Sequence, residues 1–243
     1  MATLPFPVLA LDNHLLGIAK PAGLLVQGDA TGDTDVVTLS KAYLKERFDR
    51  PGNVFVGLVH RLDRPVSGVV LLARTSKAAG RLAEAFRGRD VTKRYLAVVD
   101  GRAASAVEPG QWAESTVGLR YSERGTARVV APGASGAQRA TLRWRQIAGE
   151  GRRSLLEVDL VTGRKHQIRA QLAALGVPVL GDLRYGATVP FGNGRGIALH
   201  AVRLTAPHPT RDEAVTLVAP PPATWQGLFE GAISSYLAEA ERA

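Results

Sequence analysis

An acidic side chain surrounded by basic ones marks the segment HRLDRPVSG, residues 60–68, in which Asp63 stands between Arg61 and Arg64. A long apolar run follows, so the carboxylate is expected at the end of a buried strand, where a rigid element can carry a functional group. An Asp held by Arg stays ionised and can act as a nucleophile or a base. A structural Arg–Asp ion pair would produce the same pattern, so spacing alone leaves both interpretations open.

A second basic segment begins at Arg164. Its apolar spacing predicts a helix over residues 164–176, with Arg164 on the buried side of the first turn. A buried guanidinium needs an anionic partner, for which Asp63 is the natural candidate. The alternative is that Arg164 reaches solvent around the helix end.

Other faces of the same turn carry three more basic residues, which are Lys165, His166 and Arg169. They could present cations to a phosphate backbone, or they could form an ordinary solvated face.

Motifs for other chemistries are missing. The sequence contains no GxxxxGK[ST] loop, no GxGxxG at a strand–helix junction and no GxSxG nucleophile elbow. Its five histidines show no metal-binding spacing such as HExxH, and it has no cysteine. A zinc site and disulfides are therefore not expected.

Hydrophobic periodicity predicts the elements that position these residues. The run SGVVLLAR, residues 67–74, is typical of a strand buried on both faces. A helix should follow, with Ser76 as its N-cap and Gly88 at its end. Further strands are predicted over residues 93–101, 140–147, 154–163, 200–209 and 214–222. Helices are also predicted over 35–48 and, packed at the end of the chain, from Trp225 to Leu237.

Strands outnumber helices and do not alternate with them regularly. This favours an α+β fold with a mixed, mostly antiparallel sheet flanked by helices and loops, and argues against a doubly wound fold. Residues 102–138, rich in Gly, Ala, Ser and Pro, are expected to form hairpins and loops. No long polar linker divides the chain, so residues 1–243 are expected to form a single catalytic domain that could have two lobes.

The charge balance favours a polyanionic partner. Lys and Arg number 31 against 22 Asp and Glu, a net charge of +9, which suits RNA or DNA; solubility or codon usage could also explain it. No apolar run is long enough to cross a membrane, and the first residues do not predict a secretory leader. With no cysteine, a cytoplasmic protein is expected, and we expect a monomer.

Five segments, in order, resemble the motifs of the RluA family of pseudouridine synthases. HRLDRPVSG is similar to the family signature HRLD-x-x-[ST]-SG. The other four are KPAGLLV at 20–26, KRYLAVVDG at 93–101, TGRKHQIRAQLAALGVPVLGDLRYG at 162–186 and LHAVRLTAPHP at 199–209. The resemblance implies a pseudouridine-synthase-like fold and a cofactor-free isomerase that converts selected uridines of ribosomal or transfer RNA to pseudouridine.

The resemblance also implies roles for individual residues. Asp63 would be the catalytic aspartate, attacking the ribose or abstracting a proton from it, and Arg164 would orient it. Tyr95 would pack on the target base and could help to remove the C5 proton. Arg61 would fill the gap left when the uridine is flipped out of the stack. The remaining cations, expected to hold RNA phosphates, are Arg64, Lys93, Lys165, His166 and Arg169.

Some positions depart from the family pattern. Val66 stands where the family often has Thr, and Ala19 and Gln27 flank the first motif where Asn and His are common. Many relatives carry a small N-terminal RNA-binding module, but none is expected here, because the first motif starts near the N-terminus. RNA selection is therefore expected to rest on the catalytic domain.

Two rival functions remain open. One is an RNA-binding or chaperone protein on the same scaffold, whose chemistry is dispensable. The other is a nucleosidase or glycosidase that releases free uracil. A glycoside hydrolase usually needs a second carboxylate, and none stands out near these motifs. A single carboxylate suffices if the base is retained and attached again.

Overall fold

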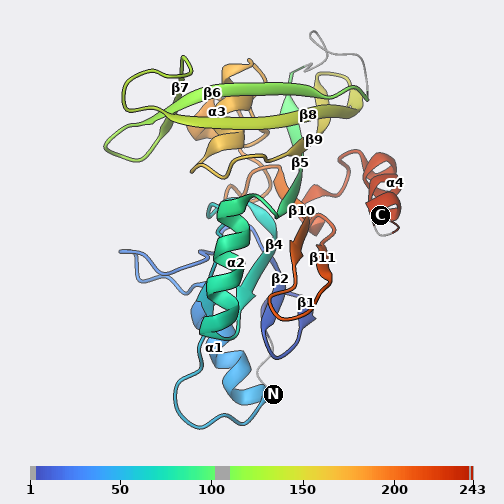
Figure 1. Cartoon of the computed structure of the whole chain (residues 1–243). Coiled ribbons are helices and arrows are strands. Elements are labelled where there is room, and N and C mark those ends of the chain that lie inside the picture. Colours follow the sequence, from blue (N-terminus) through green and yellow to red (C-terminus); the bar gives the residue numbers. More distant parts are fainter. Residues whose placement is uncertain (1–3, 102–109, 241, 243) are drawn as a thin grey trace. The chain divides into compact units, whose positions relative to one another are not determined.

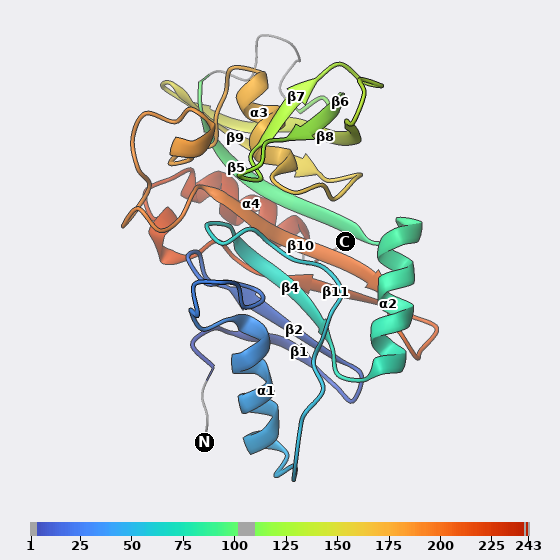
Figure 2. The ribbon, with the colours of Figure 1, turned by 90° about the vertical axis from the view of Figure 1, so that its left-hand side faces the viewer.

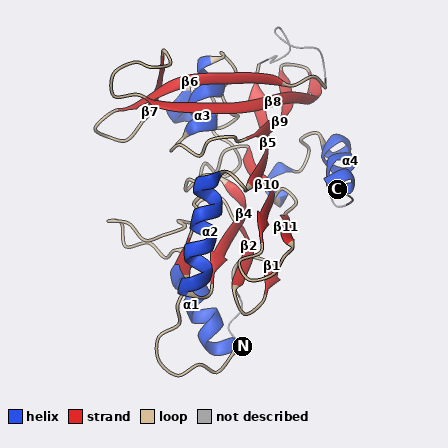
Figure 3. Cartoon of the chain, in the orientation of Figure 1, coloured by secondary structure: helices blue, strands red, loops and turns tan. Residues whose placement is uncertain are grey.

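The computed structural model describes residues 4–101, 110–240 and 242. The chain forms two compact units. The first contains Met1–Val91 and Val202–Pro220, and the second contains Thr92–Ala201 and Pro221–Ala243. The main chain therefore passes between them three times, and both units combine helices with strands (Figure 3). Each unit is described by itself below.

The first unit is built on a mostly antiparallel sheet. Its strands are β1 (Val8–Leu11), β2 (Leu15–Lys20), β3 (Gly57–Leu58), β4 (Ser67–Ala73), β10 (Leu199–Pro207, which starts in the second unit) and β11 (Ala214–Val218). Their order is β1-β2-β4-β10, with β3 paired to β4 and β11 to β10. The helices α1 (Val36–Arg47) and α2 (Ser76–Gly88) complete the unit (Figures 1 and 2).

The core of the first unit lies where α2 packs against β4. Every residue of β4 is buried, as the apolar run predicted, and α2 buries Ala78, Leu82 and Ala85 against it. Removing these apolar side chains from water stabilises the unit. The helix is capped one residue earlier than expected. Thr75, not Ser76, is the N-cap, and its hydroxyl accepts a hydrogen bond from the N–H of Ala78 at 3.1 Å.

The second unit contains an antiparallel sheet of five strands among its described residues. They are β5 (Thr92–Asp100), β6 (Ala113–Tyr121), β7 (Ala127–Val130), β8 (Gln138–Glu150) and β9 (Arg153–Asp159), in the order β5-β9-β8-β6-β7. Its helical elements are α3 (Gln167–Ala174), α4 (Glu230–Ala240) and the short 3₁₀ helices η2 (Leu183–Tyr185) and η3 (Ala223–Trp225). α3 packs against the sheet through Ala170, which meets Leu119, Ala127 and Ala140.

The register of this sheet separates two kinds of side chain. On one face, Asp159 of β9 lies opposite both Arg94 of β5 and Arg143 of β8, and the carboxylate pairs with both guanidinium groups. The neighbouring residue Tyr95 lies opposite Val158. Since successive side chains of a strand point to opposite faces, Tyr95 projects from the face that lacks this row of charges.

The predicted α+β fold with a mostly antiparallel sheet is confirmed. Of the segment 102–138, residues 102–109 lie outside the described residues, and the remainder contains the antiparallel hairpin β6–β7. The terminal helix starts later than expected, at Glu230, because the chain first makes the short turn η3 around the buried Trp225. In the described part of the chain, no helix is long and apolar enough to cross a membrane.

Candidate active site

Asp63 lies in the loop that leads from β3 into β4, directly before the buried strand, as the sequence predicted. The loop is anchored in the core by the buried side chains of Leu62 and Val66, and the carbonyl of Asp63 accepts the N–H of Val66 at 3.0 Å. The Asp63 side chain itself is half-buried. A carboxylate on such an anchored loop is held in place without being sealed from solvent.

Lys20 is a buried cation beneath this loop. Its side chain is 1% exposed, and its ammonium group donates to the carbonyls of Pro21 (2.9 Å), Leu24 (2.8 Å) and Arg64 (3.2 Å). Burial lowers the pKa of Lys20 to about 7; the charge of Asp63 opposes this shift and that of Arg64 adds to it. Lys20 thus ties the first motif to the Asp63 loop.

Sequence reasoning did not select Lys20 as a site residue. The available signal was its place at the start of KPAGLLV. A lysine before a Pro-Ala-Gly turn is ordinarily solvent-exposed, so composition alone gave no reason to expect it in the interior.

The two arginines beside Asp63 are exposed. Arg64 forms an ion pair with Asp33, with 2.6 Å between Nη2 and Oδ2, and its Nε donates to the carbonyl of Gly23 at 3.0 Å. Arg61 forms no ion pair with any residue that the structure describes. Its guanidinium group is therefore available to a ligand.

His60, the first residue of the motif, supports the loop from its other end. Its Nε2 accepts a hydrogen bond from the backbone N–H of Leu71 at 2.9 Å. Its ring also stacks on Phe86 of α2, with 4.8 Å between ring centroids. The imidazole thus accepts the hydrogen bond of a β4 N–H group, as a backbone carbonyl of a neighbouring strand would do, next to the short pairing of β3 with β4.

In the second unit, Tyr95 is 7% exposed near the start of β5. Lys93, two residues before it, shares the same face and is half-buried. The carbonyl of Lys93 accepts the N–H of Leu160 at 3.1 Å, so both backbone positions are fixed. The aromatic ring is therefore carried by a rigid strand.

The expected position of Arg164 is wrong. The helix begins at Gln167, so Arg164 precedes it, and its side chain is exposed with Nε donating to the carbonyl of Arg139 at 3.2 Å. Two features make the helix start later than predicted, at Gln167. His166 has a positive φ of 56°, and the Gln167 side chain accepts from the N–H of Arg164 and donates to the carbonyl of Thr141, at 3.0 Å each. Arg164 thus reaches solvent, the alternative left open above.

The buried cation of this segment is Arg169, which is 5% exposed. Its Nε and Nη2 donate to the two carboxylate oxygens of Asp182, at 2.6 and 2.9 Å, and its guanidinium group lies 4.9 Å from the ring centroid of Tyr185. His166 is also buried, with its Nδ1 2.9 Å from the Tyr185 hydroxyl. The sequence offered His166 and Arg169 as contacts to RNA phosphates or as part of a solvated face, and their burial agrees with neither. Lys165 is exposed.

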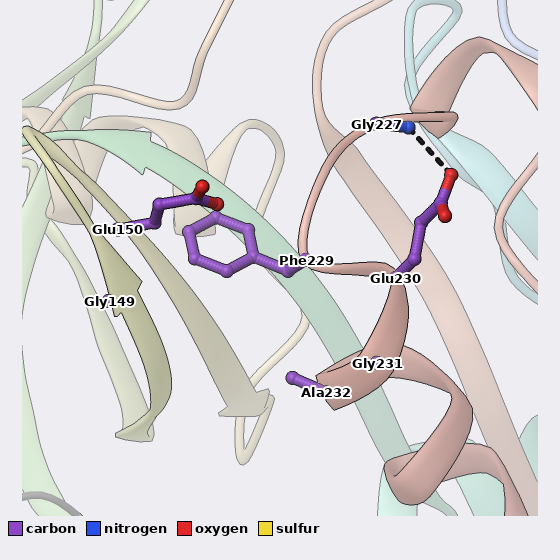
Figure 4. Close-up of a pocket in the computed structure, with 7 residues that line it drawn as sticks. All are labelled: Gly149, Glu150, Gly227, Phe229, Glu230, Gly231 and Ala232. Carbon is purple, nitrogen blue, oxygen red and sulfur yellow. Dashed lines mark hydrogen bonds between the residues drawn. The ribbon is translucent and has the colours of Figure 1, made fainter.

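A separate pocket of about 440 Å³ opens on the second unit (Figure 4). It is lined by Gly149, Glu150, Gly227, Phe229, Glu230, Gly231 and Ala232. Its charged groups are two carboxylates, which repel phosphate. None of the candidate catalytic residues lines it, so it does not suit chemistry on a nucleic acid. Among the described residues, no group of three or more His, Asp or Glu side chains could hold a metal ion.

Comparison with known proteins gives matches over nearly the whole chain. The family model described as RNA pseudouridylate synthase matches residues 14–174, a range that includes Asp63, Tyr95 and Arg164. A ribosomal large subunit pseudouridine synthase D of Xanthomonas campestris is 37% identical over 238 residues, which cover 93% of this chain and 69% of the relative. An uncharacterised RNA pseudouridine synthase of Bacillus subtilis is 34% identical over 224 residues, covering 91% and 70%.

Two solved human structures share the fold. RNA pseudouridylate synthase domain containing 1 gives a TM-score of 0.68 at 26% identity, covering 98% of this chain and 95% of the other. RNA pseudouridylate synthase domain containing 4 gives a TM-score of 0.71 at 24% identity, covering 95% and 92%.

Proposed function

Because this chain belongs to the RNA pseudouridylate synthase family, whose members are isomerases, we propose that it converts specific uridines of ribosomal RNA to pseudouridine. Relatives named ribosomal large subunit pseudouridine synthase D support ribosomal RNA as the substrate. Transfer RNA is the alternative substrate. The observation that carries the proposal is the presentation of Asp63 by a core-anchored loop at the end of β4.

The reaction needs few protein groups because it is an isomerisation. The bond between C1′ and N1 of the uridine breaks, a bond between C1′ and C5 forms, and the proton on C5 is lost while N1 gains one. Asp63 acts on the ribose, either as a nucleophile at C1′ or as a base that takes a sugar proton. The ammonium group of Lys20 places a positive charge near this carboxylate and holds its loop.

Two residues of the second unit are proposed to act on the RNA. Tyr95, fixed on β5, packs against the uracil ring and takes part in removal of the C5 proton. Of the two arginines near the start of α3, Arg169 suits a role in the chemistry better than Arg164, to which the resemblance gave that role. A group with such a role must itself be held, and Asp182 holds the guanidinium group of Arg169 from two sides.

The exposed cations are proposed to bind RNA. Arg61, with a guanidinium group that no described carboxylate neutralises, fills the space left by the flipped uridine. Arg64, Lys93, Arg164 and Lys165 contact backbone phosphates. The burial of His166 and Arg169 argues against direct phosphate contacts for these two residues.

The test compares the wild type with Asp63→Asn on unmodified ribosomal and transfer RNA transcripts, followed by site-resolved pseudouridine mapping. Asp33→Asn, which removes an exposed carboxylate of the same unit, is the matched control. We expect pseudouridine in ribosomal RNA from the wild type and the control, and none from Asp63→Asn. Equal pseudouridine from Asp63→Asn refutes the catalytic assignment.

The same experiment separates the rival functions. Release of free uracil by the wild type would identify a nucleosidase or glycosidase. Tight RNA binding without any modified uridine would identify an RNA-binding or chaperone protein. Modification of transfer RNA alone would correct the substrate and leave the chemistry standing.

A further inference from the structure

A cluster of arginines and aromatic rings lies at the C-terminal end of α1 in the first unit. We call it the Phe48 patch, and it consists of Tyr43, Arg47, Phe48, Arg50 and Arg74. The guanidinium group of Arg74 lies 4.5 Å from the ring centroid of Phe48. That of Arg47 lies 6.0 Å from Phe48 and 5.7 Å from Tyr43. Phe48 nevertheless remains 40% exposed.

Local backbone geometry gathers these side chains. α1 ends at Arg47, and Asp49 adopts a positive φ of 45° that turns the chain back. The N–H of Arg50 then donates to the carbonyl of Lys45 at 3.0 Å, which places Arg50 beside the last turn of the helix. Arg74, directly after β4, donates through its side chain to the carbonyl of Asp12. The guanidinium groups of Arg47 and Arg74 therefore converge on Phe48 from two separate parts of the chain, and the charge of Arg50 also acts on Arg74.

The patch carries more positive charge than the neighbouring carboxylates Glu46 and Asp49 supply in negative charge. Within the described residues, Arg47, Arg50 and Arg74 form no ion pair. The nearby carboxylate of Asp12 is already occupied by His208 at 2.8 Å and by Arg211 at 3.2 Å. The pKa of Arg74 is lowered by burial and further by the charges of Arg50 and Arg47, against the raising effect of Asp12. An anion bound here would relieve this repulsion.

The patch is remote from Asp63 within the same unit. β4 begins next to Asp63 and ends at Ala73, so Arg74 lies at the opposite end of a seven-residue strand. At a rise of about 3.3 Å per residue, the two ends are roughly 20 Å apart. A ligand on the patch is therefore distinct from the uridine that reacts at Asp63.

We propose that the Phe48 patch is a second RNA-binding surface. It binds the sugar–phosphate backbone of the substrate RNA at a part of the RNA that is distant from the target uridine. Arg47 and Arg50 pair with phosphates, and the exposed part of Phe48 contacts a ribose or an unpaired base. Phe48 and Tyr43 also hold the guanidinium groups in place, which lowers the entropy lost on binding. This inference rests on the proposed function, because RNA is the polyanion that such an enzyme must engage.

The test uses the full chain and two RNAs, a minimal stem–loop with the target uridine and a long ribosomal RNA fragment containing the same stem–loop. The double variant Arg47→Glu/Arg50→Glu should bind the long fragment roughly tenfold more weakly than the wild type. It should also lower the slope of log Kd against log salt concentration by about two. Its kcat/KM on the minimal stem–loop should stay within about twofold of the wild type, since that RNA does not reach the patch.

Arg87→Glu/Arg89→Glu is the matched control. It makes the same charge change at the end of the other helix of the unit, α2, where Arg87 is also in the last turn. If both double variants weakened binding of the long fragment equally, the effect would come from net charge alone, and the proposal would be overturned. Unchanged affinity of the Arg47→Glu/Arg50→Glu protein for the long fragment would also overturn it, and would favour an acidic protein as the partner. If the Arg47→Glu/Arg50→Glu protein lost affinity for both RNAs equally, the defect would be general and the proposal would also be overturned.

A second measurement needs no variant. The wild-type protein is photocrosslinked to the long fragment carrying 4-thiouridine, and the crosslinked peptides are identified. Crosslinks to the peptide that contains Tyr43 and Phe48 support the proposal, and crosslinks confined to other peptides contradict it. Both binding readouts are independent of catalysis. If the wild type made no pseudouridine, the proposed function would fail while the patch could still be judged.

Discussion

The ammonium group of Lys20 donates a hydrogen bond to the carbonyl of Arg64, 44 residues further along the chain, at 3.2 Å. The bond is not isolated. The N–H of Gly23 donates to the same carbonyl at 2.8 Å, and Nε of Arg64 donates back to the carbonyl of Gly23 at 3.0 Å. The first motif therefore holds the backbone next to Asp63 by three hydrogen bonds, and its integrity should matter for both stability and catalysis.

Lys20→Met tests this connection. The substitution keeps the apolar stem but leaves buried carbonyls without a donor, so we expect a loss of about 2 kcal/mol in the free energy of unfolding. We also expect a lower kcat, because the Asp63 loop loosens. Urea denaturation and kinetics on a minimal RNA substrate measure the two effects. A variant as stable and as active as the wild type would contradict the assigned role.

The difference in free energy of unfolding between the wild type and Lys20→Met should depend on pH, and this dependence reports the charge of Lys20. Its pKa falls from 10.5 in the unfolded chain to about 7 in the folded protein. Between these values the unfolded state binds more protons, so the free energy of unfolding rises with pH. The Met variant lacks this proton, so the stability of the wild type relative to Lys20→Met should increase from about pH 7 up to the unfolded-state pKa of 10.5. A constant difference would mean that Lys20 stays charged when buried.

His60→Leu should separate packing from hydrogen bonding at the start of the motif. Leucine can still fill space against Phe86, but it cannot accept the N–H of Leu71. We expect a loss of about 1–2 kcal/mol in stability and a lower kcat with little change in KM. His60→Gln, whose amide oxygen can reach the same N–H, should restore part of both. Equal behaviour of the Leu and Gln variants would rule out the hydrogen bond as the cause.

Two of the Arg–Asp pairs, one in each unit, differ in burial. Both have an N–O distance of 2.6 Å, but Arg169–Asp182 is buried (6% and 1% exposed side chains) and Arg64–Asp33 is exposed (46% and 50%). Asp182→Asn leaves a buried guanidinium group without its counterion and should cost about 3–5 kcal/mol. Asp33→Asn should cost less than about 1 kcal/mol. Denaturant unfolding compares them, and similar losses would contradict the burial argument.

Tyr236→Phe probes the contact of α4 with β9. The Tyr236 hydroxyl donates to the buried carboxylate of Glu157 at 2.9 Å, so we expect a loss of about 1–3 kcal/mol near neutral pH. Burial and the charge of Glu157 raise the pKa of Tyr236 above its ordinary 10.0. Above pH 10 the folded state then binds more protons, and the wild type loses stability that the Phe variant does not. The difference in free energy of unfolding between the wild type and Tyr236→Phe should therefore decrease above pH 10, which denaturant unfolding curves at several pH values can measure.

Local signals predicted the parts of the fold that depend on local sequence. The apolar run after Asp63 predicts a buried strand, because a strand that is covered on both faces consists of consecutive apolar residues. All seven residues of β4 are indeed buried. The amphipathic spacing of Ala79, Leu82, Ala83 and Phe86 likewise predicted α2 to within one residue of its cap, although the residues that the helix buries most are Ala78, Leu82 and Ala85.

The errors arose where distant partners decide the structure. Helical periodicity was extended back to Arg164 across His166, whose positive φ breaks the pattern. The burial of Arg169 depends on Asp182, thirteen residues away, and that of Lys20 on carbonyls up to 44 residues away. The chain could not be divided into two compact units from composition, because no polar linker marks the crossings.

The row of charges on one face of the second unit's sheet has a consequence for how RNA approaches. Arg94, Arg143 and Arg145 there pair with Glu157 and Asp159, and Glu114 lies opposite Arg143 in register. The same alternation places Arg139, Arg120 and Arg128 on this face, toward the β6–β7 end of the sheet. Opposite charges side by side largely cancel in salt, so the paired end of the row exerts little long-range attraction. The arginine-rich end keeps an excess of positive charge, and the face is therefore polarised along its length.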